Sequence, residues 1–110
     1  MKACFRLKKN YQYNYVYKHA QSVADKHFVL LFCKSKKTQS QVGFSVSKKY
    51  GHAVQRNRIR RQMKAAASQF MPQVKNGYNL VIVPRRQGEY EFNQIVQSLK
   101  NLLEKAELFA

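Results

Sequence analysis

The pattern of apolar and polar positions along the chain predicts three strands. Residues 28–33 (FVLLFC) form a continuous apolar run, which is typical of a strand at the centre of a sheet. Residues 42–47 (VGFSVS) alternate between large apolar and small side chains, which is the period of a strand with one face in the core. Residues 78–83 (YNLVIV) form a second buried run that ends at Pro84.

Three longer segments have the period of amphipathic helices. The first spans residues 10–19, with Asn10 as its N-cap. The second begins at residue 53, and its apolar stripe consists of Ile59, Met63, Ala66 and Phe70. The third runs from residue 89 or 90 to about residue 108, after a break at Gly88. Its stripe consists of Phe92, Ile95, Val96, Leu99, Leu102, Leu103 and Ala106. A chain of 110 residues with this order of elements predicts a single α+β domain, an α-β sandwich in which helices cover a small sheet.

The second helix has a strongly cationic face. The segment of residues 48–64 (KKYGHAVQRNRIRRQMK) contains seven basic and no acidic residues. The basic residues are Lys48, Lys49, Arg56, Arg58, Arg60, Arg61 and Lys64. Four of them and Asn57 fall on the half of the helix opposite the apolar stripe. A solvated basic face is the ordinary alternative, but no Asp or Glu at i±4 relieves the repulsion between these charges. The pattern therefore favours phosphate binding.

The first helix carries four tyrosines, at positions 11, 13, 15 and 17. Tyr13, Val16, Tyr17 and Ala20 share one face, and Tyr11 and Tyr15 share another. Because a tyrosine hydroxyl needs a partner or water, we expect some of these rings to be partly exposed, where they could stack on unpaired bases. Packing of the helix against the sheet explains any single tyrosine equally well.

The small residues of the 42–47 strand point to the same kind of ligand. Gly43, Ser45 and Ser47 leave one face of this strand unobstructed, so that a ligand backbone could approach it. An ordinary half-exposed strand explains the pattern when it is considered alone.

The net charge of +16 is unevenly distributed. Residues 1–88 carry 19 Lys/Arg and one acid (Asp25), whereas residues 89–110 carry two Lys and four Glu. The positive electrostatic potential of residues 1–88 attracts a polyanion, and nucleic acid is the commonest polyanionic partner. A membrane surface is the second candidate, but no helix combines Lys/Arg with a large exposed apolar face. Residues 1–8 have the composition of a loosely held, flexible basic arm.

The residues needed for catalysis by the chain itself are missing. Two-metal chemistry needs several converging carboxylates, and the first 88 residues contain only one. His19, His27 and His52 have no metal-ligand spacing, and there is no nucleophile elbow or glycine-rich phosphate loop. We therefore expect no catalytic residue, no metal ligand and no cofactor bound by the protein alone.

The spacing of the two cysteines and the lengths of the apolar runs indicate the cellular compartment of the protein. Cys4 and Cys33 form neither a disulfide framework nor a zinc spacing. No signal peptide and no membrane span is evident. The expected location is the reducing cytoplasm.

Three segments together resemble the protein subunit of bacterial ribonuclease P. Residues 51–61 (GHAVQRNRIRR) resemble the "RNR" signature of that family, and residues 42–49 (VGFSVSKK) are similar to the strand that leads into it. Residues 6–10 (RLKKN), followed by Tyr13, Val16 and Tyr17, resemble the family's first helix. The resemblance covers nearly the whole chain in the same order.

The resemblance implies a function and a fold. The family's partner is a catalytic RNA, which holds the Mg²⁺ ions and removes the 5′ leader of precursor tRNA, and a complex of one protein with one RNA is expected. The implied order of elements is αβββαβα, with a left-handed βαβ crossover around a small mixed sheet, contrary to the usual right-handed rule.

The resemblance also implies site residues. The implied leader cleft consists of Tyr13, Tyr17, Phe44, Ser45 and Ser47. The implied RNA-binding motif consists of Lys48, Lys49, Arg56, Asn57, Arg58, Arg60, Arg61 and Lys64. Arg85 and Arg86 would extend the basic rim. The alternatives are a structural RNA-binding protein, such as a small ribosomal protein, and a DNA-binding module; the latter lacks a helix-turn-helix pattern.

Overall fold

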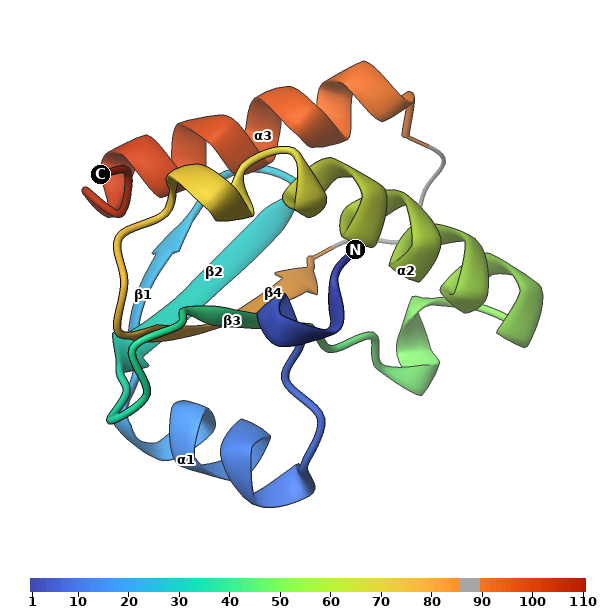
Figure 1. Cartoon of the computed structure of the whole chain (residues 1–110). Coiled ribbons are helices and arrows are strands. Elements are labelled where there is room, and N and C mark those ends of the chain that lie inside the picture. The colour runs from blue at the N-terminus through green and yellow to red at the C-terminus, as the bar shows by residue number, and fades with distance from the viewer. Residues whose placement is uncertain (86–89) are drawn as a thin grey trace.

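The computed structural model describes residues 1–85 and 90–110, which form one mixed four-stranded sheet between two layers of helices (Figure 1). The main elements are α1 (Asn10–His19), β1 (Gln21–Ala24), β2 (Phe28–Lys34), β3 (Gln41–Phe44), α2 (Ala53–Ser68), β4 (Tyr78–Pro84) and α3 (Phe92–Lys105). Short 3₁₀ turns occupy η1 (Ala3–Phe5), η2 (Lys48–Tyr50) and η3 (Met71–Gln73). The α+β class and the order αβββαβα are as predicted.

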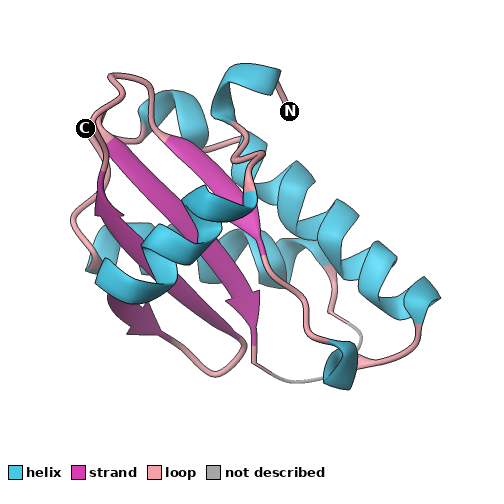
Figure 2. Cartoon of the chain, turned by 90° about the horizontal axis from the view of Figure 1, so that it is seen from below, coloured by secondary structure: helices cyan, strands magenta, loops and turns pink. Residues whose placement is uncertain are grey.

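The sheet has the strand order β1-β2-β4-β3. β1 pairs with β2 and β2 with β4 in antiparallel fashion, whereas β3 and β4 are parallel. α2 makes the connection between the two parallel strands, and the views from the side and from below show that this crossover is left-handed (Figures 1 and 2). β1 is the strand that periodicity did not find, because its four residues (QSVA) contain no apolar alternation and lie at an edge of the sheet.

All three helices begin in the same way. A glutamine in the first turn of each helix accepts a hydrogen bond from the backbone N–H of the residue just before the helix. The distances are 3.0 Å for Gln12 and Lys9, 2.9 Å for Gln55 and His52, and 3.0 Å for Gln94 and Glu91. The prediction that Asn10 caps α1 was wrong, because Asn10 is already the first helical residue.

One face of the sheet carries the main core, which it forms with α2 and α3. The predicted stripe of α2 is confirmed, since Ile59, Met63, Ala66 and Phe70 are all buried. On α3 the buried stripe consists of Ile95, Leu99, Leu102 and Leu103. The predicted helix was too long at both ends: α3 begins at Phe92, which is 38% exposed, and ends at Lys105. Glu107 then adopts a left-handed conformation (φ 57°), which turns the buried Leu108 back onto the core.

The opposite face of the sheet is covered by α1, which Figure 2 shows lying across the strands. Its buried cluster is small and consists of Leu7, Val16 and Val81. The segment expected to be a loose arm contributes to this cluster: Leu7 is buried, and its N–H donates to the Val42 carbonyl at 3.0 Å. An apolar residue thus fixes this part of the basic N-terminal segment against the edge strand β3.

The cysteines are free. Cys33 packs half-buried beside this smaller cluster, and burial raises the pKa of its thiol, whereas Cys4 is exposed. Among the described residues, no helix is long and apolar enough to cross a membrane.

Candidate nucleic-acid interface

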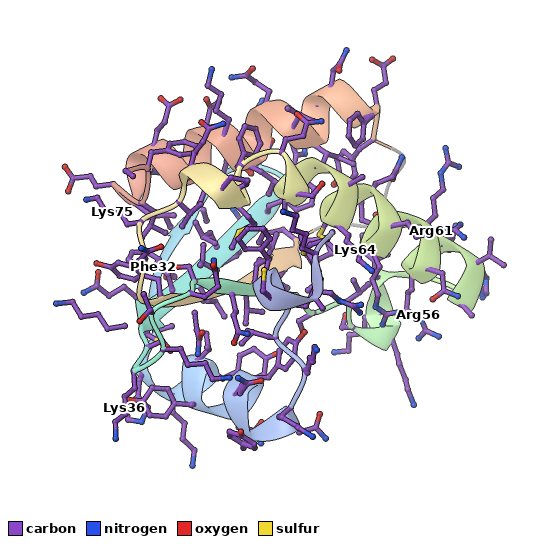
Figure 3. All side chains as sticks on the ribbon, viewed as in Figure 1. Phe32, Lys36, Arg56, Arg61, Lys64 and Lys75 are labelled. Carbon is purple, nitrogen blue, oxygen red and sulfur yellow. The ribbon has the colours of Figure 1, made fainter. Side chains whose placement is uncertain are left out.

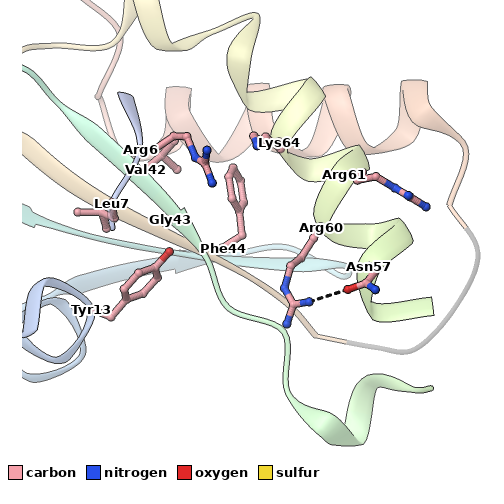
Figure 4. A pocket seen from close by; sticks show the side chains of 10 residues that line it. All are labelled: Arg6, Leu7, Tyr13, Val42, Gly43, Phe44, Asn57, Arg60, Arg61 and Lys64. Atoms are coloured by element: carbon pink, nitrogen blue, oxygen red, sulfur yellow. Dashed lines mark hydrogen bonds between the residues drawn. The ribbon is translucent and has the colours of Figure 1, made fainter. Parts of the chain in front are cut away.

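A cleft of about 460 Å³ lies where α1, β3 and α2 meet (Figure 4). Its lining residues are Arg6, Leu7, Tyr13, Val42, Gly43, Phe44, Asn57, Arg60, Arg61 and Lys64. None of these residues is acidic, and five of them carry a guanidinium, an ammonium or an amide. The cleft therefore combines an aromatic and apolar floor with cationic walls.

Tyr13 is the aromatic residue at the centre of this site. Its ring lies against Gly43, where an added Cβ would come within 2.5 Å of Cε1 and Cζ of the ring. The prediction that Gly43 leaves its face open for a ligand was therefore wrong, because the glycine makes room for a ring of the protein itself. Burial raises the pKa of the Tyr13 phenol, and a hydrogen bond to the Phe44 backbone and the charges of Arg6 and Arg60 oppose this shift. The phenol is thus neutral at physiological pH.

A second hollow of about 420 Å³ continues the cleft along α1. It shares Tyr13, Phe44 and Arg60 with the first. Its other lining residues are Asn10, Asn14, Tyr17, Ser45 and Val46. The Tyr17 ring is 49% exposed, and its centroid lies 6.5 Å from that of Tyr13 with the ring planes 42° apart. Two adjacent rings in one groove provide stacking surfaces for two successive bases.

The structure brings together four of the five residues predicted for the leader cleft. Tyr13, Tyr17, Phe44 and Ser45 line the two hollows. Ser47 is not among the lining residues; it precedes η2, where its carbonyl accepts the N–H of Tyr50 at 3.0 Å.

The predicted cationic motif divides into two groups. Asn57, Arg60, Arg61 and Lys64 line the cleft, and Nη1 of Arg60 donates to Oδ1 of Asn57 at 3.0 Å (Figure 4). The second group lies on η2 and the first turns of α2, outside the cleft lining, and consists of Lys48, Lys49, Arg56 and Arg58. Arg61 is exposed, whereas Arg56 is half-buried; Figure 3 labels both on α2.

Of the predicted basic rim, Arg85 does not line the cleft. The backbone N–H of Arg85 donates to the His27 carbonyl at 2.8 Å, and its Nη1 donates to the Asp25 carbonyl at 2.7 Å. Arg85 thus closes the turn between β1 and β2. Arg86 lies outside the described residues.

Sequence reasoning missed several lining residues, namely Arg6, Leu7, Asn10, Asn14 and Val46. Arg6 and Leu7 had been assigned to the loose arm. The available signal was Leu7, a single large apolar residue between basic ones, which indicates a segment held against the core.

A metal ion needs several His, Cys, Asp or Glu side chains as its ligands. Among residues 1–85 and 90–110, no group of three or more His, Cys, Asp or Glu side chains could hold one. Aromatic rings and cations around a cleft without acidic residues define a protein of the nucleic-acid-binding class.

Comparison with known proteins assigns the family. The Ribonuclease P family profile matches residues 1–107, and the chain belongs to this family. It is 39% identical over 104 residues to the ribonuclease P protein component of Clostridioides difficile, covering 93% of this chain and 91% of that one. It is 38% identical over 109 residues to the ribonuclease P protein component of Clostridium kluyveri, covering 96% of both.

Solved structures agree with this assignment. The RNase P protein of Staphylococcus aureus superimposes with a TM-score of 0.86 at 32% identity, covering 99% of this chain and all of that one. The RNase P protein of Thermotoga maritima superimposes with a TM-score of 0.81 at 26% identity, covering 91% of this chain and 96% of that one. Because the chain belongs to this family, its partner is the RNase P RNA. It is part of the ribonuclease P holoenzyme, which cleaves tRNA precursors. The ribosomal and DNA-binding alternatives are set aside.

Proposed function

We propose that this chain binds the 5′ leader of precursor tRNA in its cleft while the RNase P RNA, bound alongside, cleaves the bond between leader and tRNA. The observation that carries the proposal is the composition of the two adjoining hollows. Tyr13 and Tyr17 from α1 face a groove whose other wall holds Arg60, Arg61 and Lys64 of α2. An unpaired strand has both features that such a groove binds, stacked bases and a phosphate backbone.

The two groups of cations take different roles in this proposal. Those in the cleft neutralise leader phosphates, and those outside it, on η2 and the start of α2, contact the RNase P RNA. Each phosphate contact lowers log K by about 0.7 to 0.9 per unit of log salt concentration, so binding weakens steeply with salt. Because every base has a π-face, leader recognition depends only weakly on sequence.

The protein contributes binding rather than bond breaking. The described lining of the cleft contains no carboxylate and no histidine that could act as a general acid or base. We assign the Mg²⁺-dependent chemistry to the RNA, with one protein for each RNA and no cofactor held by the protein alone. The cytoplasm, where precursor tRNA is made, is the proposed location.

Reconstitution tests the proposal. The purified chain is mixed with an RNase P RNA at low Mg²⁺, and cleavage of precursor tRNA and affinity for precursor and mature tRNA are measured. We expect strong stimulation of cleavage, tighter binding of the precursor than of mature tRNA, and no cleavage by the protein without the RNA. Two results would overturn the proposed function. One is full-rate cleavage by the protein alone, and the other is that adding the protein to the RNase P RNA gives no preference for precursor over mature tRNA.

A further inference from the structure

A third hollow, of about 280 Å³, lies beside the N-terminal segment and shares Arg6 with the cleft. It is lined by Ala3, Cys4, Arg6, Lys8, Lys9, Tyr11, Gln12, Lys37 and Gln41. We propose that this hollow is a second single-stranded RNA subsite, which receives leader nucleotides beyond those held in the cleft. The inference rests on the proposed function and extends it from a single cleft to a longer track.

The charges of the hollow fit an RNA backbone. Arg6, Lys8 and Lys9 come from the N-terminal segment, and Lys37 comes from the loop between β2 and β3. The fold thus gathers four cations from two distant parts of the chain, and none of the described residues that line the hollow is acidic. Phosphates relieve the repulsion within such a group.

A chain of amide hydrogen bonds holds the floor of the hollow. Gln12 is buried, and its Nε2 donates to Oε1 of Gln41 at 3.4 Å, while Nε2 of Gln41 donates to the Cys4 carbonyl at 3.4 Å. Oε1 of Gln12 accepts the backbone N–H groups of Lys8 at 3.1 Å and Lys9 at 3.0 Å. These helix-terminal amides are therefore already bonded, and the side-chain cations remain as the ligands for phosphate.

The hollow also offers a stacking surface. The Tyr11 ring is 70% exposed, the largest exposure of any tyrosine on α1. Its neighbours Lys8 and Lys9 line the same hollow. An exposed ring beside several cations is the arrangement that binds single-stranded nucleic acid without sequence preference.

Arg6 connects the hollow to the cleft. Among the described lining residues it is the one that both share, so a strand leaving the cleft meets its guanidinium before it reaches Tyr11 and Lys37. The direction in which the leader runs, from the cleft to the third hollow, follows from the position of the second group of cations. Arg56 lies at the end of the molecule opposite to Lys36, the neighbour of Lys37 (Figure 3). If Arg56 and the residues near it contact the RNase P RNA, the scissile bond lies at that end, and the third hollow lies beyond the cleft.

The RNase P RNA is the competing occupant of this hollow, and leader length distinguishes the two. Affinity for precursor tRNA is measured with the reconstituted holoenzyme over leaders of about 4 to 16 nucleotides, the range of site sizes of small single-strand-binding domains. The variants are Tyr11→Ala and Lys37→Ala. The controls are Tyr15→Ala, an exposed tyrosine one turn further along α1, and Lys36→Ala, an exposed lysine beside Lys37; neither lines the hollow.

We expect the wild-type affinity to rise in two steps with leader length, the first for the cleft and the second for this hollow. Tyr11→Ala should abolish the second step, with a loss of about fivefold or more for long leaders. Lys37→Ala should reduce the salt slope of long-leader binding by about 0.7. The short-leader affinities and both controls should match the wild type.

Three results would overturn the proposal. If affinity rises in a single step with leader length and then stays constant, while precursor is still preferred over mature tRNA, the third hollow does not bind the leader and only the cleft does. An equal loss at every leader length for Tyr11→Ala and Lys37→Ala would assign the hollow to the RNase P RNA. If no leader of any length is preferred over mature tRNA, the proposed function itself fails and this inference falls with it.

Discussion

The two faces of the sheet differ in how completely they are covered. In the described part of the chain, the core between the sheet and the helices α2 and α3 contains 18 buried residues, whereas the core under α1 contains three. The cleft opens at the margin of the sparsely covered face, where β3 passes between α1 and the cationic side of α2 (Figure 4). The comparison indicates that the first face supplies most of the stability and that the second provides the binding surface.

The comparison predicts different costs for truncating core residues on the two faces. Leu102→Ala, in the main core, should lower the free energy of unfolding by about 2–5 kcal/mol. Val16→Ala, equally buried under α1, should cost about 1.5 kcal/mol, at about 0.8 kcal/mol for each methyl or methylene group removed. Urea denaturation measures both. The comparison is made per methyl or methylene group removed, three for Leu102→Ala and two for Val16→Ala, and equal costs per group would contradict the division of labour.

Gly43→Ala should break the α1 side without touching the main core. The new Cβ collides with the Tyr13 ring, so the ring must move out of its place in the cleft, at a cost of about 1–3 kcal/mol in stability. Precursor affinity should fall while mature tRNA affinity is unchanged. The double variant Gly43→Ala/Tyr13→Ala supplies the check. Its destabilisation should be smaller than the sum of the two single effects, and strict additivity would argue against the collision.

The two sides of α1 can be compared directly with two tyrosines of similar exposure. Tyr17→Ala, in the groove, should cost about 1–3 kcal/mol of precursor affinity in the holoenzyme. Tyr15→Ala, whose ring stacks on His19 with centroids 4.3 Å apart and which lines neither the cleft nor its continuation, should leave it unchanged. If both variants lose affinity for mature tRNA as well, the effect is structural rather than leader contact.

The smallest expected effect concerns charge. Arg61→Ala removes a cation from the cleft wall and should flatten the salt dependence of leader binding by about 0.7 in log–log slope. Lys100→Ala, an exposed cation on α3, should leave the slope unchanged. An unchanged slope for Arg61→Ala would remove this residue from the phosphate contacts.

Strong local patterns allowed much of this fold to be predicted from the sequence. The continuous apolar runs predicted β2 and β4, and the stripe from Ile59 to Phe70 predicted the buried side of α2. β1, at a sheet edge, has no such pattern. The resemblance to a known family implied three strands before α2 and the left-handed crossover that general rules disfavour. It gave neither the residues of β1 nor its position at the edge of the sheet.

The candidate site was predictable in composition but not in its packing. The tyrosines and cations were identified because their chemistry is unusual for a helix. Three features depend on which segments meet in three dimensions. They are the contact of Tyr13 with Gly43, the burial of Gln12 and the hydrogen bond from Arg85 to the Asp25 carbonyl. A single sequence carries no information on such meetings beyond the periodicity of each segment.

The most direct test of the central claim is a cross-link from the leader. Precursor tRNA with 4-thiouridine in its leader is bound to the reconstituted holoenzyme and irradiated, and the attached peptides are identified. The account predicts cross-links to the segments that line the groove, residues 13–17, 43–46 and 57–64. Cross-links confined to α3, or to the RNA alone with none to the protein, would contradict it.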